Sequence, residues 1–180
     1  GWAAGDSGTI VHTDDGGNSW NTLPNNITQD IIDLRFIDLN NGWLIGRDLC
    51  GIIMHSADGG MSWETQFSDT NFYPQGLCFT DLNNGWVIGD TGSYYGYGIL
   101  LHTENGGLTW ENQYNGDFHF EDIFFIDNEF GYIVGDSKTL FTTNGGDTWV
   151  VDFFDPYGET TYFDVFFADS INGWILGSGE

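Results

Sequence analysis

The sequence predicts an all-β protein built as a run of β-propeller blades, each a four-stranded antiparallel sheet. Three observations support this prediction. Short apolar runs alternate with turns rich in Gly, Asn and Asp, the pattern of strands joined by tight hairpins. No stretch keeps a helical spacing of apolar residues over three turns. A unit of about forty residues recurs along the chain, and such a unit with four strands has the size of one propeller blade.

Two interleaved motifs define the repeat. The first is an eight-residue segment that opens on Thr or Ser, contains a Gly-Gly pair and closes on a tryptophan, and it occurs four times, closing at Trp20, Trp63, Trp110 and Trp149. The second is Gly-Trp or Gly-Tyr, with another Gly three residues after the aromatic, beginning at Gly1, Gly42, Gly85, Gly131 and Gly173. An acidic turn such as 38–41 precedes the second motif.

Each unit contains four predicted strands, A to D in chain order. Strand A is the apolar run before the acidic turn, at 34–37, 76–79, 123–126 and 165–167. Strand B carries the Gly-Trp motif, strand C leads into the eight-residue segment, and strand D begins at the tryptophan that closes it. The resulting boundaries are a partial blade at 1–30, blades at 31–74, 75–119 and 120–160, and a partial blade at 161–180.

The register of the repeat predicts seventeen strands: three, then three sets of four, then two. The chain opens in a strand B and stops just after another, so a four-bladed ring would have two strands competing for one place. Unpaired sheet edges favour association. We therefore expect a propeller of more than four blades completed by further chain, or self-association in which a neighbouring subunit supplies strands to the open blade edges.

The eight-residue segments have the chemistry of structural turns. Gly tolerates the positive φ that a tight hairpin needs. The opening Ser or Thr and the Asp or Asn two residues later can cap amides of their own turn, and the tryptophan can pack as an apolar wedge. The residues predicted to have this structural role are Thr13, Asp15, Gly17, Trp20, Ser56, Asp58, Gly60, Trp63, Thr103, Asn105, Gly107, Trp110, Thr142, Asn144, Gly146 and Trp149.

These segments resemble the Asp box, S/T-x-D-x-G-x-S/T-W, of the bacterial neuraminidase repeat, which occurs in sialidases, sortilins and xyloglucan-cleaving glycosidases. The full unit, Asn-Gly-Trp-x-x-Gly before His-Thr-x-Asp-Gly-Gly-x-Ser-Trp, is most similar to the photosystem II stability/assembly factor family. The resemblance covers nearly the whole chain and implies a propeller whose Asp boxes are turn staples away from any active site. It implies less about function, because one fold supports many functions.

The charge of the chain is strongly acidic, with 27 Asp and Glu residues against Arg35, Arg47 and Lys138 and a net charge of -24. Nucleic-acid binding requires many more basic residues. Anionic membrane surfaces are disfavoured for the same reason, and no apolar run approaches the ~18 residues of a membrane span. A cationic partner, bound cations or a salty medium would fit, as would a solvated surface kept soluble by repulsion. Cys50 and Cys78 are the two cysteines, and the sequence leaves open whether they pair.

Metal, cofactor and catalytic sites are not predicted. His12, His55 and His102 share one repeat position, so ~10 Å or more should separate them on successive blades, whereas zinc ligands lie ~2 Å from one ion. His119 is unique to its unit and its role stays open. A sialidase holds its substrate carboxylate with three arginines, and this chain has two. A glycosidase needs two carboxyl groups at a defined separation, and no pair stands out among 27 acids.

The unrepeated loops are the predicted binding surface. D-to-A links and B-to-C turns should share one face, here called the loop face, which collects aromatic residues that the repeat does not explain. The candidate partner-binding residues are Tyr73, Tyr94, Tyr95, Tyr97, Tyr114 and Tyr157. The alternative is that these rings pack over the blades as additional core.

The leading functional prediction is a non-catalytic recognition or structural module of a bacterial protein at an extracellular, cell-surface or periplasmic location. It would bind a protein or carbohydrate partner through the loop face, without a cofactor. One alternative is a fragment of an Asp-box glycoside hydrolase of the xyloglucanase kind, which close, buried carboxylates with raised pKa in a groove would favour. The other is an assembly factor resembling the photosystem II family.

Overall fold

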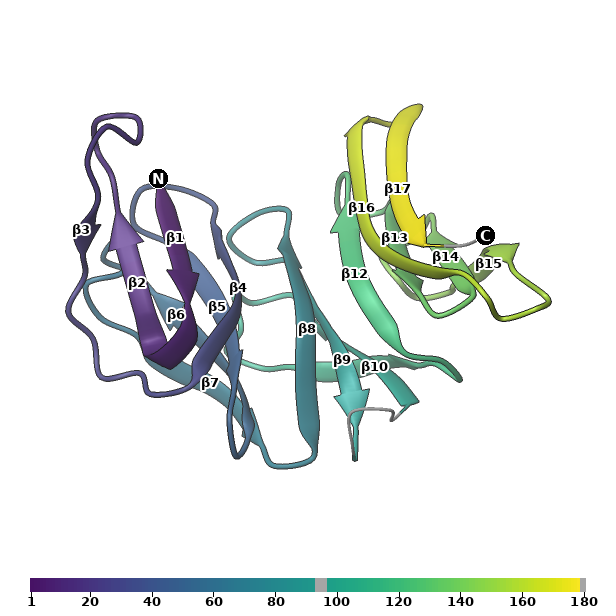
Figure 1. Ribbon diagram of the computed structural model, residues 1–180, viewed down its shortest axis with the longest axis horizontal. Helices are drawn as coiled ribbons and strands as arrows, with labels where there is room; N and C mark the ends of the chain where they lie inside the picture. The colour runs from purple at the N-terminus through teal and green to yellow at the C-terminus, as the bar shows by residue number, and fades with distance from the viewer. Residues whose placement is uncertain (93–96, 179–180) are drawn as a thin grey trace.

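The computed structural model describes residues 1–92 and 97–178. Over these residues the chain forms seventeen strands in five antiparallel sheets and one 3-10 turn at Asp6–Gly8. Figure 1 shows the sheets following one another along an arc, with the two termini on opposite limbs. The prediction of an all-β chain with four-stranded antiparallel sheets is confirmed. No helix in the described part of the chain is long and apolar enough to cross a membrane.

The sheets are numbered here as blades 1 to 5. Blade 1 contains β1 (Trp2–Gly5), β2 (Thr9–His12) and β3 (Asn21–Thr22). Blade 2 contains β4 (Asp30–Phe36), β5 (Gly42–Arg47), β6 (Gly51–Ser56) and β7 (Glu64–Asp69). Blade 3 contains β8 (Phe72–Phe79), β9 (Gly85–Thr91), β10 (Tyr97–Thr103) and β11 (Glu111–Asn115). Blade 4 contains β12 (Phe120–Phe125), β13 (Gly131–Gly135), β14 (Lys138–Thr142) and β15 (Val150–Phe154), and blade 5 contains β16 (Thr161–Asp169) and β17 (Asn172–Ser178).

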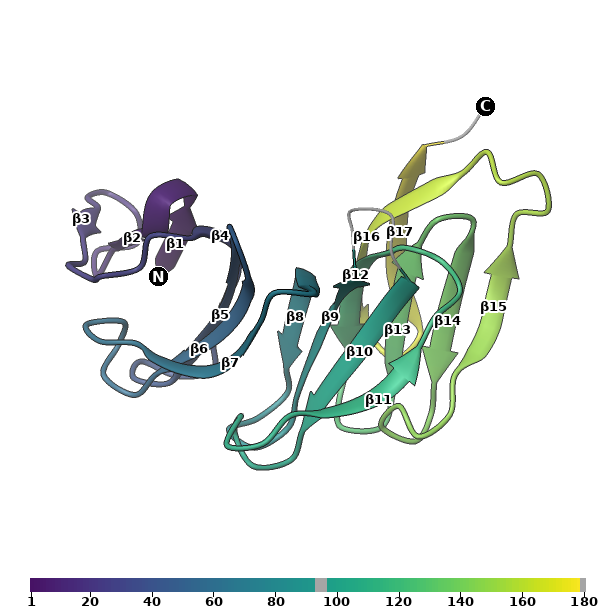
Figure 2. The ribbon, with the colours of Figure 1, turned by 90° about the horizontal axis from the view of Figure 1, so that it is seen from below.

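Neighbouring blades meet at a repeated aromatic stack. The strand B aromatic of each blade stacks on a strand A phenylalanine of the next, with centroid distances of 3.8 Å for Trp2–Phe36, 3.9 Å for Trp43–Phe79, 3.7 Å for Trp86–Phe125 and 4.4 Å for Tyr132–Phe167. Figure 2 shows blades 3 and 4 as adjacent sheets. Trp43 and Trp86 are each 1% exposed, so these rings are the largest apolar units of the core.

The strand B indoles of blades 1 to 3 also bond to the Asp box of the next blade. The Nε1–H groups of Trp2, Trp43 and Trp86 donate to the carbonyls of Gly59, Gly106 and Gly145 at 2.9, 3.1 and 3.2 Å. The glycine before the aromatic is required by close packing. A Cβ at Gly85 would lie 2.3 Å from the ring of Phe79 in its own blade. The Gly-Trp motif is therefore the joint between blades, a role that the repeat alone did not reveal.

The Asp box of blade 2 illustrates the turn chemistry of all four. The hydroxyl of Ser56 donates to Asp58 at 2.9 Å and accepts from the amide of Gly60 at 2.8 Å. Asp58 also accepts from the amide and hydroxyl of Ser62 at 2.8 and 2.6 Å. Gly59 and Gly60 have φ of 76° and 90°, the left-handed region that glycine tolerates. Asn105 and Asn144 accept the corresponding amide bonds in blades 3 and 4.

The box tryptophans are less buried than those of strand B. Trp63 is half-buried and presents its ring edge to Phe36, with the centroids 5.9 Å apart. Its Nε1–H donates to the carbonyl of Gly60 at 3.1 Å. The packing role predicted for the box tryptophan is thus shared with the strand B ring, which contributes the larger buried surface.

The repeated histidines pack on the strand B tryptophans. His55 stacks on Trp43 at 4.6 Å and His102 on Trp86 at 4.8 Å. Burial lowers the pKa of both imidazoles. Among the described residues, no group of three metal-ligating side chains comes together. Cys50 and Cys78 are both free thiols.

Candidate functional site

The loop face is built from D-to-A links and B-to-C turns that bond to one another. The amide of Gly92 donates to Asn71 at 3.1 Å, and the amide of Asp136 donates to the carbonyl of His119 at 3.2 Å. The Asp boxes bond instead to the acidic A-to-B turns, as in Gly59 to Asn40 at 2.9 Å. The two kinds of loop therefore occupy opposite faces, and the bonds between links and turns hold the loop face in position.

A buried histidine–carboxylate pair lies at this face between blades 3 and 4. His119 precedes β12, and its Nδ1 forms an ion pair with Asp90 at the end of β9. The Asp90 side chain is 0% exposed and that of His119 13%. The hydrogen bond to Asp90 raises the pKa of His119, and burial partly opposes this increase. The imidazole of His119 is therefore the partner of an acidic side chain that has no access to water.

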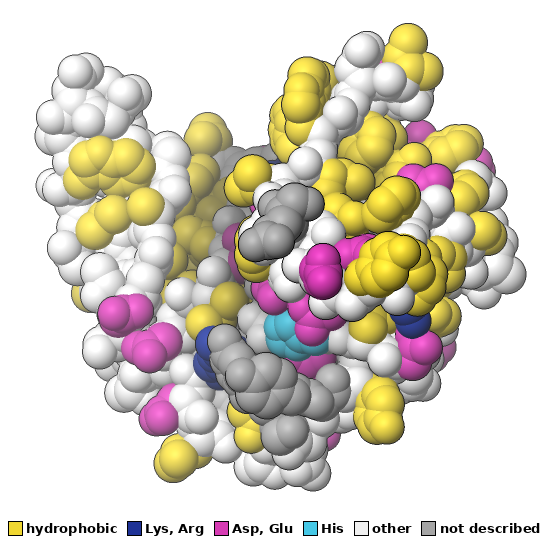
Figure 3. All heavy atoms as spheres, turned by 45° about the vertical axis from the view of Figure 1, so that its right-hand side comes forward, with side chains coloured by type: hydrophobic (Ala, Val, Ile, Leu, Met, Phe, Trp, Pro, Cys, Tyr) yellow, Lys and Arg dark blue, Asp and Glu magenta, His cyan; other side chains and the backbone are white. Residues whose placement is uncertain are grey.

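Further acids surround this pair. The Nε2 of His119 lies 3.4 Å from Glu121 in β12, and burial raises the pKa of that glutamate. Asp136, in the adjacent B-to-C turn, acts electrostatically on both groups. Figure 3 shows acidic side chains gathered around a histidine side chain on this side of the molecule. We call Asp90, His119, Glu121 and Asp136 the His119 cluster.

One basic residue lies beside the cluster. Lys138 bonds to Asp117 at 2.6 Å, and the bond lowers the pKa of that aspartate. The ammonium also lies 5.2 Å from the ring centroid of Phe118. Because Asp117 already neutralises Lys138, the net charge of the region stays negative.

The tyrosines predicted to bind a partner have different environments. Tyr97 and Tyr157 are 69% and 84% exposed, and Tyr73 is half-buried. Tyr114 packs between blades on Phe120 and Trp149, at 6.3 and 6.4 Å between centroids, and burial raises its pKa. Tyr94 and Tyr95 lie outside the described residues. Tyr97 and Tyr157 are thus the candidates whose rings are open to a partner.

A second group of carboxylates lines the inner strands of blades 2, 4 and 5. Asp33, Asp122 and Asp164 hold equivalent positions on β4, β12 and β16, and Gly76 takes this position in β8. Asp33 accepts the amide of Leu77 at 3.1 Å, and Asp122 accepts that of Val165 at 2.9 Å. Each therefore joins its inner strand to that of the next blade.

Asp122 and Asp164 also interact directly with each other. They line a cavity of about 350 Å³ with Asp33 and Arg35. Burial and a hydrogen bond with Asp164 raise the pKa of Asp122 to about 7. Sequence reasoning missed these residues, although the Asp three residues before the strand A phenylalanine is a detectable signal. It also missed Asp90 and Glu121, whose importance depends on contact with His119.

Comparison with known proteins gives the family. The family model described as "Photosynthesis system II assembly factor YCF48" matches residues 20–117, more than half of the chain. No curated protein matches significantly. The structure titled "YCF48 bound to D1 peptide" is 22% identical with a TM-score of 0.61, covering 89% of this chain and 53% of that one. "YCF48 from Cyanidioschyzon merolae" is 17% identical with a TM-score of 0.69, covering 98% and 63%.

The fold extends to glycoside hydrolases. A GH74 enzyme of Niastella koreensis is 19% identical with a TM-score of 0.63, and the match covers 89% of this chain and 30% of the enzyme. The chain spans less than two thirds of either YCF48 structure, so these likenesses show a partial propeller fold. They confirm the predicted fold class. Because the family model covers more than half of the sequence, the chain belongs to the photosystem II assembly factor YCF48 family of Asp-box repeats.

Proposed function

We propose that this protein is a non-catalytic recognition module that binds an extended, positively charged segment of a partner protein on its loop face. The observation that carries the proposal is the His119 cluster, where acids converge on a buried Asp90–His119 pair between two blades. A net charge of -24 supports a cationic partner. One solved structure of similar fold is titled as bound to a D1 peptide, which shows that a related propeller binds a polypeptide segment.

The loop face can supply both parts of such an interaction. Glu121 and Asp136 would attract Lys or Arg side chains and increase the rate of encounter. Tyr97 and Tyr157 offer exposed rings, and aromatic residues are enriched at the centres of protein interfaces. The rigid blades hold these groups in place, so little ordering would be needed on binding.

The glycoside hydrolase alternative is less well supported by the inner-strand carboxylates. A glycosidase needs two carboxyl groups free to act on a sugar bound between them. Asp122 and Asp164 interact with each other within one small cavity. Asp122 also accepts a hydrogen bond from the amide of Val165. We therefore assign this pair to blade packing.

Location and self-association belong to the same proposal. We place the module at an extracellular, cell-surface or periplasmic location, where an acidic surface would meet a cationic segment of its client. In the described part of the chain β17 pairs with β16, and Trp174 and Leu176 are exposed. We propose that these exposed apolar side chains form a second surface for association with another protein chain.

The test is a binding titration with fluorescein-labelled peptides of equal length, one rich in Lys and Arg and one rich in Asp and Glu. We expect the cationic peptide to bind, and Glu121→Gln with Asp136→Asn to weaken it several-fold. Asp14→Asn, which removes a charge on the Asp-box face, is the matched control and should have little effect. Equal affinity for the two peptides, or equal loss in the control, would reject the proposal.

A further inference from the structure

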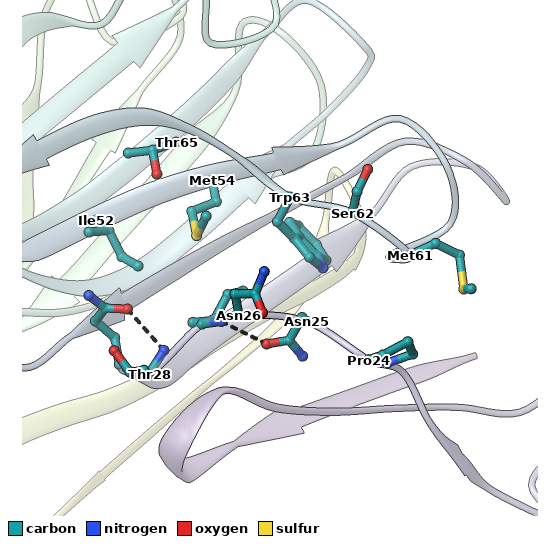
Figure 4. A pocket seen from close by; sticks show the side chains of 12 residues that line it. Pro24, Asn25, Asn26, Thr28, Ile52, Met54, Met61, Ser62, Trp63 and Thr65 are labelled. Carbon is teal, nitrogen blue, oxygen red and sulfur yellow. Dashed lines mark hydrogen bonds between the residues drawn. The ribbon is translucent and has the colours of Figure 1, made fainter.

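A groove of about 510 Å³ separates blade 1 from the outer strands of blade 2. Residues 24–29, which link β3 to β4, form one wall, and β6 with the start of β7 forms the other. Figure 4 shows Trp63 and Met54 on the blade 2 side and Asn26 and Thr28 on the opposite side. Its volume lies within the range of ligand pockets, roughly 300–1,000 Å³.

Aromatic rings fill the equivalent space at the next two interfaces. Phe67 pairs opposite Ile53 in blade 2, and Tyr114 pairs opposite Leu100 in blade 3. Both rings belong to the hydrophobic clusters between blades. In blade 1 the corresponding residue is Pro24, which follows the box tryptophan by four residues, as Phe67 and Tyr114 do.

A second ring is missing from the same place. Phe72 is the first residue of β8 and Phe118 lies two residues before β12, and both are buried between blades. By the register of the inner strands, Gln29 stands at this position before β4. Two aromatic rings at each of the other interfaces are thus replaced by Pro24 and Gln29, and the groove occupies the space that they leave.

The walls of the groove are uncharged, although the chain has 27 acidic residues. The apolar part is formed by Ile52, Met54 and Trp63, and the polar part by amides and hydroxyls. Asn25 donates to the carbonyl of Gly8 at 3.0 Å and accepts the amide of Ile27 at 2.9 Å, so it holds the link in shape. A charged ligand would find no ion partner here, and its desolvation would oppose binding.

We propose that this groove binds a neutral carbohydrate, with one sugar ring packed against Trp63 where the neighbouring interfaces hold aromatic side chains. A pyranose ring has an apolar C–H surface for the indole and hydroxyl groups at its edge for Asn26, Thr28 and Thr65. This combination of an aromatic surface with uncharged donors and acceptors matches the walls of the groove. The site is separate from the His119 cluster and does not depend on the peptide-binding proposal.

The test is isothermal titration calorimetry and tryptophan fluorescence with neutral oligosaccharides of glucose, xylose and mannose. An oligogalacturonate and a neutral Phe-containing tripeptide are the comparison ligands. At least one neutral oligosaccharide should bind with a Kd in the micromolar to low millimolar range. Failure of the whole neutral panel, stronger binding of the oligogalacturonate, or binding of the tripeptide alone would overturn the proposal.

Gln29→Phe is the decisive variant because it restores a ring that the other two interfaces already contain. It should weaken sugar binding at least tenfold without lowering the Tm, and Pro24→Phe should act in the same direction. Leu49→Phe adds a ring at an exposed turn and is the matched control. Unchanged sugar affinity in both Gln29→Phe and Pro24→Phe would also refute the assignment. Binding of the cationic peptide should persist in Gln29→Phe, which separates the two proposals.

Discussion

Asp122→Asn should stabilise the protein at alkaline pH and have little effect at acidic pH. The side chain accepts the amide of Val165 at 2.9 Å and hydrogen-bonds with Asp164. Burial is the main reason that its pKa rises from 3.8 to about 7, and the contact with Asp164 adds to the increase. The folded state therefore binds this proton more tightly than the unfolded state does. An asparagine preserves the shape of the protonated acid and cannot ionise.

The sign and size of the effect follow from linkage. The stability contributed by protonated Asp122 is complete below pH 3.8 and is lost as the pH rises to about 7. Each pKa unit corresponds to about 1.4 kcal/mol, which sets an upper limit of about 4 kcal/mol. Because water reaches part of the site, we expect about 1–3 kcal/mol. The amide introduced by Asp122→Asn would still accept from Val165 and donate to Asp164.

The assay is urea unfolding followed by tryptophan fluorescence at pH 4.5 and pH 8. The free energy of unfolding of Asp122→Asn, relative to the parent protein, should increase by about 1–3 kcal/mol between the two pH values. Other titrating groups, including His119, are common to both proteins and cancel in this difference. Asp33→Asn is the control and should show a smaller change. Asp33 makes the same bond to the next blade, to Leu77, and the pKa increase caused by its burial is opposed by hydrogen bonds from the amides of Leu77 and Leu34 and by the charge of Arg35. A pH-independent difference for Asp122→Asn, or destabilisation at pH 8, would refute the reasoning.

Three further predictions follow from the packing and charge. In chemical denaturation, Trp43→Ala should lower the free energy of unfolding by about 3–5 kcal/mol and Trp63→Ala by about 1–2 kcal/mol, because Trp43 is buried and Trp63 is half-exposed. Equal losses would contradict the assignment of strand B as the joint between blades. His119→Ala should lower the free energy of unfolding by about 3 kcal/mol, because it leaves Asp90 buried without its cation. The loss should be greater at pH 6 than at pH 8.5, since the pKa of His119 is raised, and a loss that is the same at both pH values would count against the charged pair. The Tm should rise from low to moderate NaCl because salt screens a net charge of -24, and a flat titration by differential scanning calorimetry would argue against this repulsion.

The repeated elements could be predicted from the sequence because their chemistry is local. The Gly-Gly pairs, the Ser or Thr hydroxyls and the Asp or Asn side chains act within eight residues of chain. The bonds of Ser56, Asp58 and Ser62 show this at one box. Strand positions follow from the same spacing, since a turn of fixed chemistry sets where each strand begins. The propeller architecture is thus encoded in features that recur along the chain.

The candidate sites depend on contacts between residues far apart in the sequence, and only the tertiary structure decided them. Asp90 and His119 come from different blades, and the raised pKa of Asp122 comes from its burial between inner strands, with a smaller contribution from Asp164 on the next one. The groove beside Trp63 exists because Pro24 and Gln29 replace rings that other interfaces contain, a difference that has meaning only once the blades are packed. The sequence by itself therefore determined the blades, through local turn chemistry and period. Packing between blades decided burial, charge pairing and open space, because these depend on which distant side chains meet.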